Sequence, residues 1–153
     1  MTESVNEYKY WHLRNHKLFA VLNNSQIQDL CVILRYKVAF KNEVIHFSDN
    51  QRIYFLKKGI IKIIEVDEDG NENITDIIKK GDIFGQLGGD AGAIDGDKME
   101  QAIVISKEVD ICSFKMNDFE DLLERYPSIG LQFSKLIGFK LKRLKRRYSD
   151  LIF

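Results

Sequence analysis

The segment from Gly81 to Ala102, GDIFGQLGGDAGAIDGDKMEQA, is the part of the chain that most resembles a ligand-binding loop. Glycines recur through it at positions 85, 88, 89, 92 and 96. Glycine lets a backbone turn tightly and brings main-chain N–H groups close to a bound anion, as Gly-rich loops do for phosphates. The segment therefore has the composition of a phosphate-binding loop, although negative charge is added to it by Asp90, Asp95, Asp97 and Glu100.

Two helices are predicted near the N-terminus, because apolar residues recur at helical spacing from Asn6 to Leu22 and from Ser25 to Leu34. Ser25 is expected to cap the second helix. From Arg35 to about Met116, short runs of Val, Ile, Phe and Tyr alternate with turn sequences roughly every ten residues, which favours an antiparallel sandwich or barrel. Asp69-Gly70 predicts a tight hairpin within this region.

The C-terminal part returns to helical periodicity after Asn117, which we expect to cap a short helix. Pro127 should separate that helix from a long one. Apolar residues then follow at gaps of four, three, four and three, at Ile137, Leu141, Leu144, Tyr148 and Leu151. This seam can pack against the β-region, but the surrounding Lys and Arg leave a stripe as narrow as that of a two-helix coiled coil. We therefore expect a homodimer through the long helix.

A family resemblance is carried by GDIFGQL, in which Gly81-Asp82 is followed after two residues by Gly85-Gln86-Leu87. This arrangement resembles the cyclic-nucleotide-binding domain of the Crp/Fnr regulators and of cyclic-nucleotide-dependent kinases and channels. The segments YFLKKGIIKI, DEDG and ERYP and the long helix extend the resemblance over most of the chain. It implies a mainly β fold with flanking α-helices, namely a double-stranded β-helix (jelly roll) with a long C-terminal dimerisation helix.

The resemblance also implies an organisation and a function. N-terminal helices are expected in residues 1–34, a β-roll sensor in 35–116 and C-terminal helices in 117–153, with a DNA-binding domain after 153. The chain would then sense a small-molecule effector, and it would reach DNA and RNA polymerase only through that further domain. The alternative is a free-standing cyclic-nucleotide-binding-like module without DNA-binding activity.

The phosphate-binding charges of this family are not retained. A Glu at the position of Gln86 normally binds the ribose 2′-OH, and an Arg-Ser/Thr-Ala sequence binds the cyclic phosphate. Only Ala102 of that sequence is present, and it is preceded by Glu100 and Gln101, so a carboxylate stands where the resemblance calls for a guanidinium. Lys98 is a candidate replacement cation in a loop that looks several residues longer than usual.

Other ligand contacts follow from the same resemblance. They are expected from Gly85, Leu87 and Gly88 in the loop, and from Leu144 and Lys145 where the long helix would face adenine, although neither offers a hydroxyl. Classical cyclic AMP binding is therefore not expected. Either the loop closes the pocket, or the pocket takes an uncharged or cationic effector and is lined by Asp95, Asp97 and Glu100.

Composition is that of a soluble globular domain, with 153 residues, 44% hydrophobic and 30% charged. No run approaches the roughly 18 apolar residues of a membrane span, and the N-terminus lacks the apolar core of a signal peptide, so we expect a cytoplasmic protein without a membrane partner. The seven Lys or Arg between Lys135 and Arg147 are typical of a solvated helix face, with nucleic acid or an anionic surface as the other interpretation.

Metal and enzyme chemistry have little support. His12 and His16 lie four residues apart, but without a further ligand at matching spacing we expect them to be solvated. His46 is expected to be a half-buried structural residue, and Cys31 a small core residue. The chain lacks the N-terminal cysteine cluster and early proline of the iron–sulfur and haem sensors, so no cofactor is expected. We find no paired catalytic carboxylates, Ser-His-Asp set or P-loop, and we expect no enzyme activity.

Overall fold

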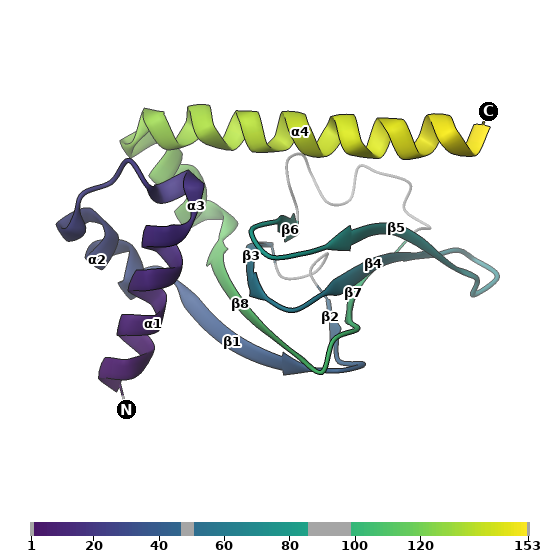
Figure 1. Cartoon of the computed structure of the whole chain (residues 1–153), viewed down its shortest axis with the longest axis horizontal. Coiled ribbons are helices and arrows are strands. Elements are labelled where there is room, and N and C mark those ends of the chain that lie inside the picture. The colour runs from purple at the N-terminus through teal and green to yellow at the C-terminus, as the bar shows by residue number, and fades with distance from the viewer. Residues whose placement is uncertain (1, 47–50, 86–98, 153) are drawn as a thin grey trace.

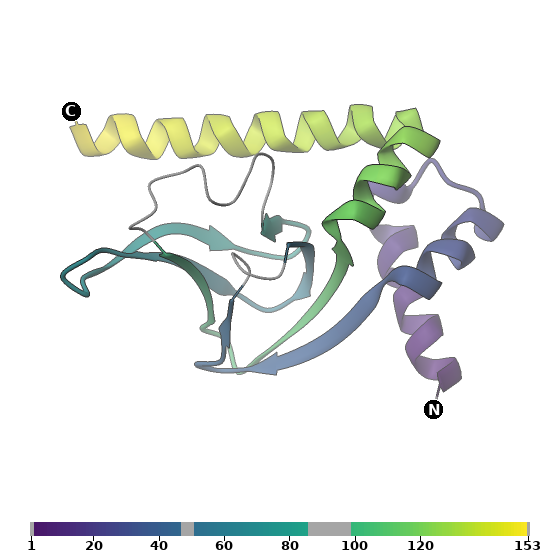
Figure 2. The same cartoon turned by 180° about the vertical axis from the view of Figure 1, so that it is seen from behind.

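The computed structural model describes residues 2–46, 51–85 and 99–152. Helices stand at one end of the molecule, the strands form a roll, and one long helix runs along the roll (Figures 1 and 2). The N-terminal elements are α1 (Thr2–Asn15), the 3-10 helix η1 (Lys17–Phe19) and α2 (Asn24–Ile33). The C-terminal helices are α3 (Met116–Arg125) and α4 (Pro127–Ile152).

Eight strands lie between α2 and α3 in the described residues: β1 (Arg35–Phe40), β2 (Val44–Ile45), β3 (Arg52–Lys58), β4 (Ile61–Val66), β5 (Glu72–Ile78), β6 (Ile83–Gly85), β7 (Met99–Val104) and β8 (Glu108–Lys115). They form two four-stranded sheets with the orders β1-β8-β3-β6 and β2-β7-β4-β5. All the strand pairs are antiparallel. The predicted mainly β, jelly-roll fold with flanking helices is confirmed.

The sheet that contains β3 and β8 is covered on both faces. Side chains alternate along a strand, so Tyr54 and Leu56 join the core between the two sheets, whereas Ile53 and Phe55 join a second core beneath the helices. This explains why β3 is almost continuously apolar. The second core also contains apolar residues of α1, η1, α2, α3 and α4, and it fixes these helices to the roll.

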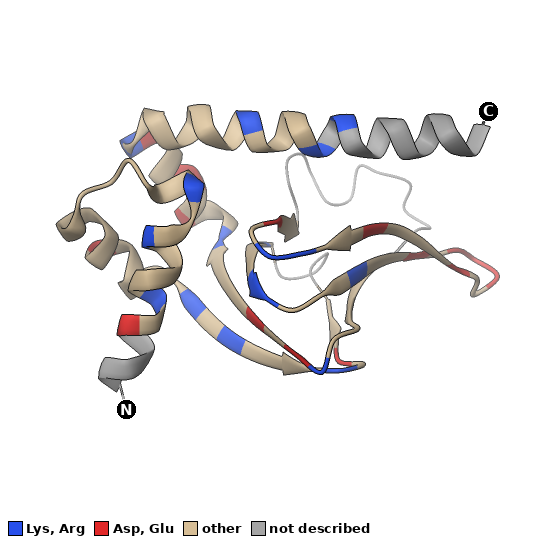
Figure 3. Cartoon of the chain, in the orientation of Figure 1, with Lys and Arg blue, Asp and Glu red and all other residues tan. Residues whose placement is uncertain are grey.

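The turns and helix boundaries follow local rules. Asp67 and Gly70 close the hairpin between β4 and β5, with Gly70 N–H donating to Asp67 O at 3.0 Å. Gly70 has a φ of +81°, which glycine adopts without strain. The predicted hairpin is confirmed, and its tip is acidic (Figure 3). Pro127 begins α4 directly after α3, as expected.

The predicted helix caps and first helix end were wrong. Asn23, not Ser25, caps α2: its side chain accepts from Gln26 N at 2.8 Å, and Gln26 Oε1 accepts from Asn23 N at 2.9 Å. This reciprocal pair is a capping box, which satisfies two main-chain donors at once. Asn117 lies inside α3, which begins at Met116 without a side-chain cap. The first helix ends at Asn15 rather than Leu22.

Candidate functional site

The Gly-rich segment begins where β6 ends. Gly85 has a φ of +120°, and a Cβ built on it would lie 2.4 Å from Arg52 O, so only glycine fits this position. Gln86, Leu87, Gly88 and Lys98 lie outside the described residues, as do Asp95 and Asp97. The structure therefore positions the two ends of the segment, β6 and β7.

Strand β7 contains Glu100, Gln101 and Ala102, the positions that correspond to the Arg-Ser/Thr-Ala sequence of the family. Their side chains alternate between the two faces of the strand. Ala102 is fully buried opposite Ile63 inside the roll. Glu100 shares that face by strand alternation, whereas Gln101 lies on the other. Glu100 stands directly opposite Glu65 of β4. Glu100 is exposed as a residue, but partial desolvation of its carboxyl, and next the Glu65 charge, raise its pKa, while Lys140 acts in the opposite direction.

Lys140 of α4 is a cation that acts on Glu100, and the sequence did not indicate it. Its Nζ lies 3.3 Å from Asp76 Oδ2, and the two side chains are only 16% and 6% exposed. The same Nζ donates to Ile83 O at 2.7 Å. The other carboxylate oxygen, Asp76 Oδ1, accepts from Ile77 N at 2.8 Å. One ammonium group thus fastens α4 to β5 and to β6.

A second buried cation, Arg52, was also missed. Its Nε donates to Ser113 Oγ at 2.9 Å and its Nη2 to Ser113 O at 3.1 Å. Burial, with a smaller contribution from Arg35, lowers its pKa. The residue next to it, Ile53, pairs with Gly85, so Arg52 belongs to the strand beside the start of the Gly-rich segment. An arginine at the start of an apolar strand was the only signal in the sequence.

The long helix extends through the whole predicted seam. Leu141, Leu144, Lys145, Tyr148 and Leu151 all lie within α4, but their side chains fall outside the described set. Ile137 is half-buried against the core beneath the helices of its own chain. The helix also presents Leu131, which is 59% exposed.

The two N-terminal histidines are buried, so their predicted exposure was wrong. His12 is 6% and His16 8% exposed. His12 Nδ1 lies 2.8 Å from Cys112 Sγ. His16 Nδ1 accepts from Leu18 N at 3.1 Å, which leaves Nε2–H to donate to Gly81 O at 3.1 Å. Nothing in the local sequence indicated the distant partners that bury these rings.

Burial sets the charge of both imidazoles. It lowers the pKa of His12 to about 4 and also lowers that of His16. Burial likewise raises the pKa of the Cys112 thiol to about 12, so the His12–Cys112 pair is neutral at pH 7. The expectation for His46 was also wrong, because this residue is exposed.

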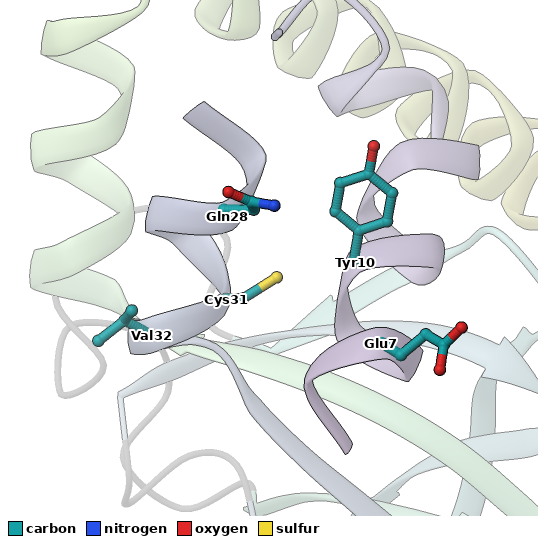
Figure 4. Close-up of a pocket in the computed structure, with 5 residues that line it drawn as sticks. All are labelled: Glu7, Tyr10, Gln28, Cys31 and Val32. Atoms are coloured by element: carbon teal, nitrogen blue, oxygen red, sulfur yellow. The ribbon is translucent and has the colours of Figure 1, made fainter. Parts of the chain in front are cut away.

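A cavity of about 400 Å³ lies between α1 and α2 (Figure 4). Its lining includes Tyr10, Gln28 and the Cys31 thiol, which points toward α1 in Figure 4. Cys31 is buried as expected, and burial raises the pKa of its thiol, which makes it a poor nucleophile. In the described ranges, no three His, Cys, Asp or Glu side chains gather as metal ligands. None of the helices described has the length and apolar character of a membrane span.

The comparisons with known proteins agree with this fold. The cyclic nucleotide-binding domain family matches residues 38–126. The cAMP-activated global transcriptional regulator CRP of Pasteurella multocida is 28% identical over 120 residues, which cover 77% of this chain and 56% of that protein. The chain thus spans about half the length of the curated relatives it matches.

Two solved structures show the same fold. A CooA mutant from Carboxydothermus hydrogenoformans has a TM-score of 0.68 at 19% identity and covers 92% of this chain and 88% of its own. The regulatory subunit of a cAMP-independent protein kinase A from Trypanosoma cruzi, bound to guanosine, has a TM-score of 0.61 at 19% identity, over 92% of this chain and 50% of its own. The match over residues 38–126 shows that this chain belongs to the cyclic nucleotide-binding domain family, and within it the chain is similar in sequence to CRP and in fold to CooA.

Proposed function

We propose that this chain is the effector-sensing, dimerising domain of a Crp/Fnr-type transcription regulator, and that its effector is not cyclic AMP. The observation that carries the proposal is the attachment of α4 to the roll through Lys140. Its ammonium group binds Asp76 of β5 and the carbonyl of Ile83, and Ile83 lies in the strand that ends at Gly85. A ligand that shifts β6 therefore also shifts a contact that holds the long helix.

The effector is expected to be uncharged or cationic. Glu100, which is exposed, pairs with Glu65 across β7 and β4, so two carboxyl groups lie side by side where the family resemblance calls for a cation. The same fold holds a nucleoside without a phosphate in a kinase regulatory subunit that is bound to guanosine. The effector would shift α4 only if it binds one arrangement of this helix more tightly than the other.

The proposal includes a domain division and partners. Residues 1–34, 35–116 and 117–153 act as N-terminal helices, sensor and dimerisation helices, and DNA and RNA polymerase are contacted by a domain after residue 153. The CRP relatives support this, because the chain matches 56% of the length of the first of them. The second candidate is a free-standing binding module, and the coding sequence that follows Phe153 distinguishes the two.

Cyclic AMP should bind no tighter than roughly millimolar, because a buried phosphate needs a cation and Glu100 supplies the opposite charge. Titration calorimetry measures this directly. Glu100→Arg restores the guanidinium of the family and should tighten binding by about tenfold or more, the usual effect of one charge-assisted hydrogen bond. Glu68→Arg, at the exposed hairpin tip, is the control for added charge and should change nothing.

A micromolar dissociation constant for the unmodified chain would contradict the argument from Glu100. It would mean that cations such as Lys140 or Arg52 compensate for the missing arginine. Equal tightening by Glu100→Arg and Glu68→Arg would likewise show that the position of the charge is irrelevant.

Dimerisation should depend on the seam of α4. The double substitution Leu141→Asp and Leu144→Asp would place like charges opposite each other in an apolar interface, at a cost of roughly 3–5 kcal/mol for buried, unpaired charge. Sedimentation equilibrium should then show a monomer. Leu131→Asp changes an exposed leucine of the same helix and should leave the dimer intact. A dimer that persists in the double variant would place the interface elsewhere.

A further inference from the structure

A second cleft lies between α1 and the roll, and no residue from Gly85 to Ala102, where the ligand contacts of the family are expected, is among those that line it. Its volume is about 430 Å³, within the usual range for small-molecule sites. The lining comes from α1, from the end of β3, and from the turn before β6, with one residue from β8. The cleft therefore joins the N-terminal helix to the sensor roll.

Two buried imidazoles hold the walls of this cleft together. His16, which directly follows α1, donates to Gly81 O in the turn before β6, and His12 of α1 contacts Cys112 of β8. Both rings are neutral at pH 7, because burial lowers their pKa values. The two histidines therefore connect α1 to the roll without adding charge to the cleft.

The charged residues of the lining are mostly cationic. Lys57, Lys58 and Lys80 line the cleft together with one acid, Asp110. Lys58 is paired with Glu108 at 3.3 Å, but both side chains are largely exposed and such surface pairs contribute little. The pKa of Lys57 is lowered by burial, with Asp110 opposing this and Lys80 adding to it. Asp110 therefore has a larger effect on Lys57 than Lys80 does, but with three lysines to one acid the lining keeps an excess of positive charge that can attract an anion.

Aromatic rings stand beside these cations. Tyr8 and Trp11 of α1 line the cleft and remain 46% and 51% exposed. Lys57 Nζ lies 3.5 Å from the centroid of the Tyr8 ring, in a cation–π contact. Exposed rings offer a stacking surface to a planar group, and ammonium groups next to them attract an anion. Together, these two features favour a ligand that has both a planar ring and a negative charge.

We propose that this cleft is a second ligand site, distinct from the one expected between Gly85 and Ala102, that binds a small planar aromatic molecule carrying a phosphate. The ring stacks against Tyr8 or Trp11, and the phosphate is held by Lys57 and Lys80. Occupancy of the site ties α1 more firmly to the roll.

Phenyl phosphate is a suitable probe, and Trp11 is a built-in reporter because the chain has one tryptophan. Titration should give a saturable change in tryptophan fluorescence. Phenol and inorganic phosphate should each bind at least about tenfold more weakly, since each lacks one of the two recognised groups. Lys57→Gln and Lys80→Gln should each weaken phenyl phosphate binding by about tenfold, the usual effect of losing one charge-assisted contact.

Two controls accompany these variants. Lys41→Gln removes an exposed lysine outside the cleft and should leave phenyl phosphate binding unchanged. Circular dichroism checks that each variant is folded, and Lys80 is exposed, so its variant does not depend on core packing. Equal binding of phenol, or no effect of Lys57→Gln and Lys80→Gln, would overturn the proposal. Binding to phosphatidylserine vesicles without binding to phenyl phosphate would overturn it in favour of a membrane surface.

Discussion

Replacing Lys140 with methionine should lower the free energy of unfolding by about 3–5 kcal/mol at neutral pH, the usual cost of removing one partner of a buried ion pair. The substitution takes away the ammonium group 3.3 Å from the carboxylate of Asp76, and that carboxylate is nearly inaccessible to water. It also removes the donor to Ile83 O. Urea denaturation followed by circular dichroism measures the change.

Lys135→Met is the matched control, because Lys135 is an exposed lysine of the same helix and its loss should cost within about 0.5 kcal/mol. Adding Asp76→Asn to Lys140→Met should recover part of the lost stability, since the carboxylate no longer has to be buried without its lysine. If Lys140→Met were no more harmful than Lys135→Met, the contact would not hold α4.

Acid should destabilise the protein through His12. The unfolded chain protonates this imidazole near pH 6.5, whereas burial keeps it neutral in the folded protein down to about pH 4. Unfolding therefore takes up a proton between these values, and stability is lost as the pH falls from 6.5 toward 4. At about 1.4 kcal/mol for each pKa unit, His12 accounts for a loss of about 3 kcal/mol. The lowered pKa of His16 acts in the same direction.

His12→Asn removes the titrating ring, so the free energy of unfolding of this variant should depend less on pH across this window. The slope against pH should be smaller by the contribution of about one bound proton. Carboxylates titrate in both proteins and cancel in the comparison. Parallel pH profiles for the two proteins, or an NMR titration of His12 with a midpoint near its ordinary value, would show that the buried imidazole is not the cause.

The features that the sequence predicted correctly are those that nearby residues determine. The hairpin needs only Asp69-Gly70, and the break between the last two helices needs only Pro127. The cap of α2 was misplaced because Asn23 and Ser25 are both good capping residues. Gln26, three residues after Asn23, distinguishes them, since it completes the capping box.

The features that the sequence did not predict depend on contacts between distant segments. His12 meets Cys112, 100 residues away, so its burial follows from how α1 docks on β8. Lys140 belongs to a basic run, and the composition of that run is equally typical of a helix face exposed to solvent. Asp76, an acid within the apolar strand sequence ITDII, was the one local hint that a cation had to be near.

Hydrogen–deuterium exchange of the Lys140→Met chain tests most directly whether α4 and the strand that enters the Gly-rich segment are coupled. We expect faster exchange in two places at once, in α4 around Lys140 and in β6, whose amides pair with β3. Lys135→Met should leave exchange in β6 unchanged. Faster exchange confined to α4, with β6 as protected as in the unmodified chain, would contradict the coupling on which the proposed sensing function rests.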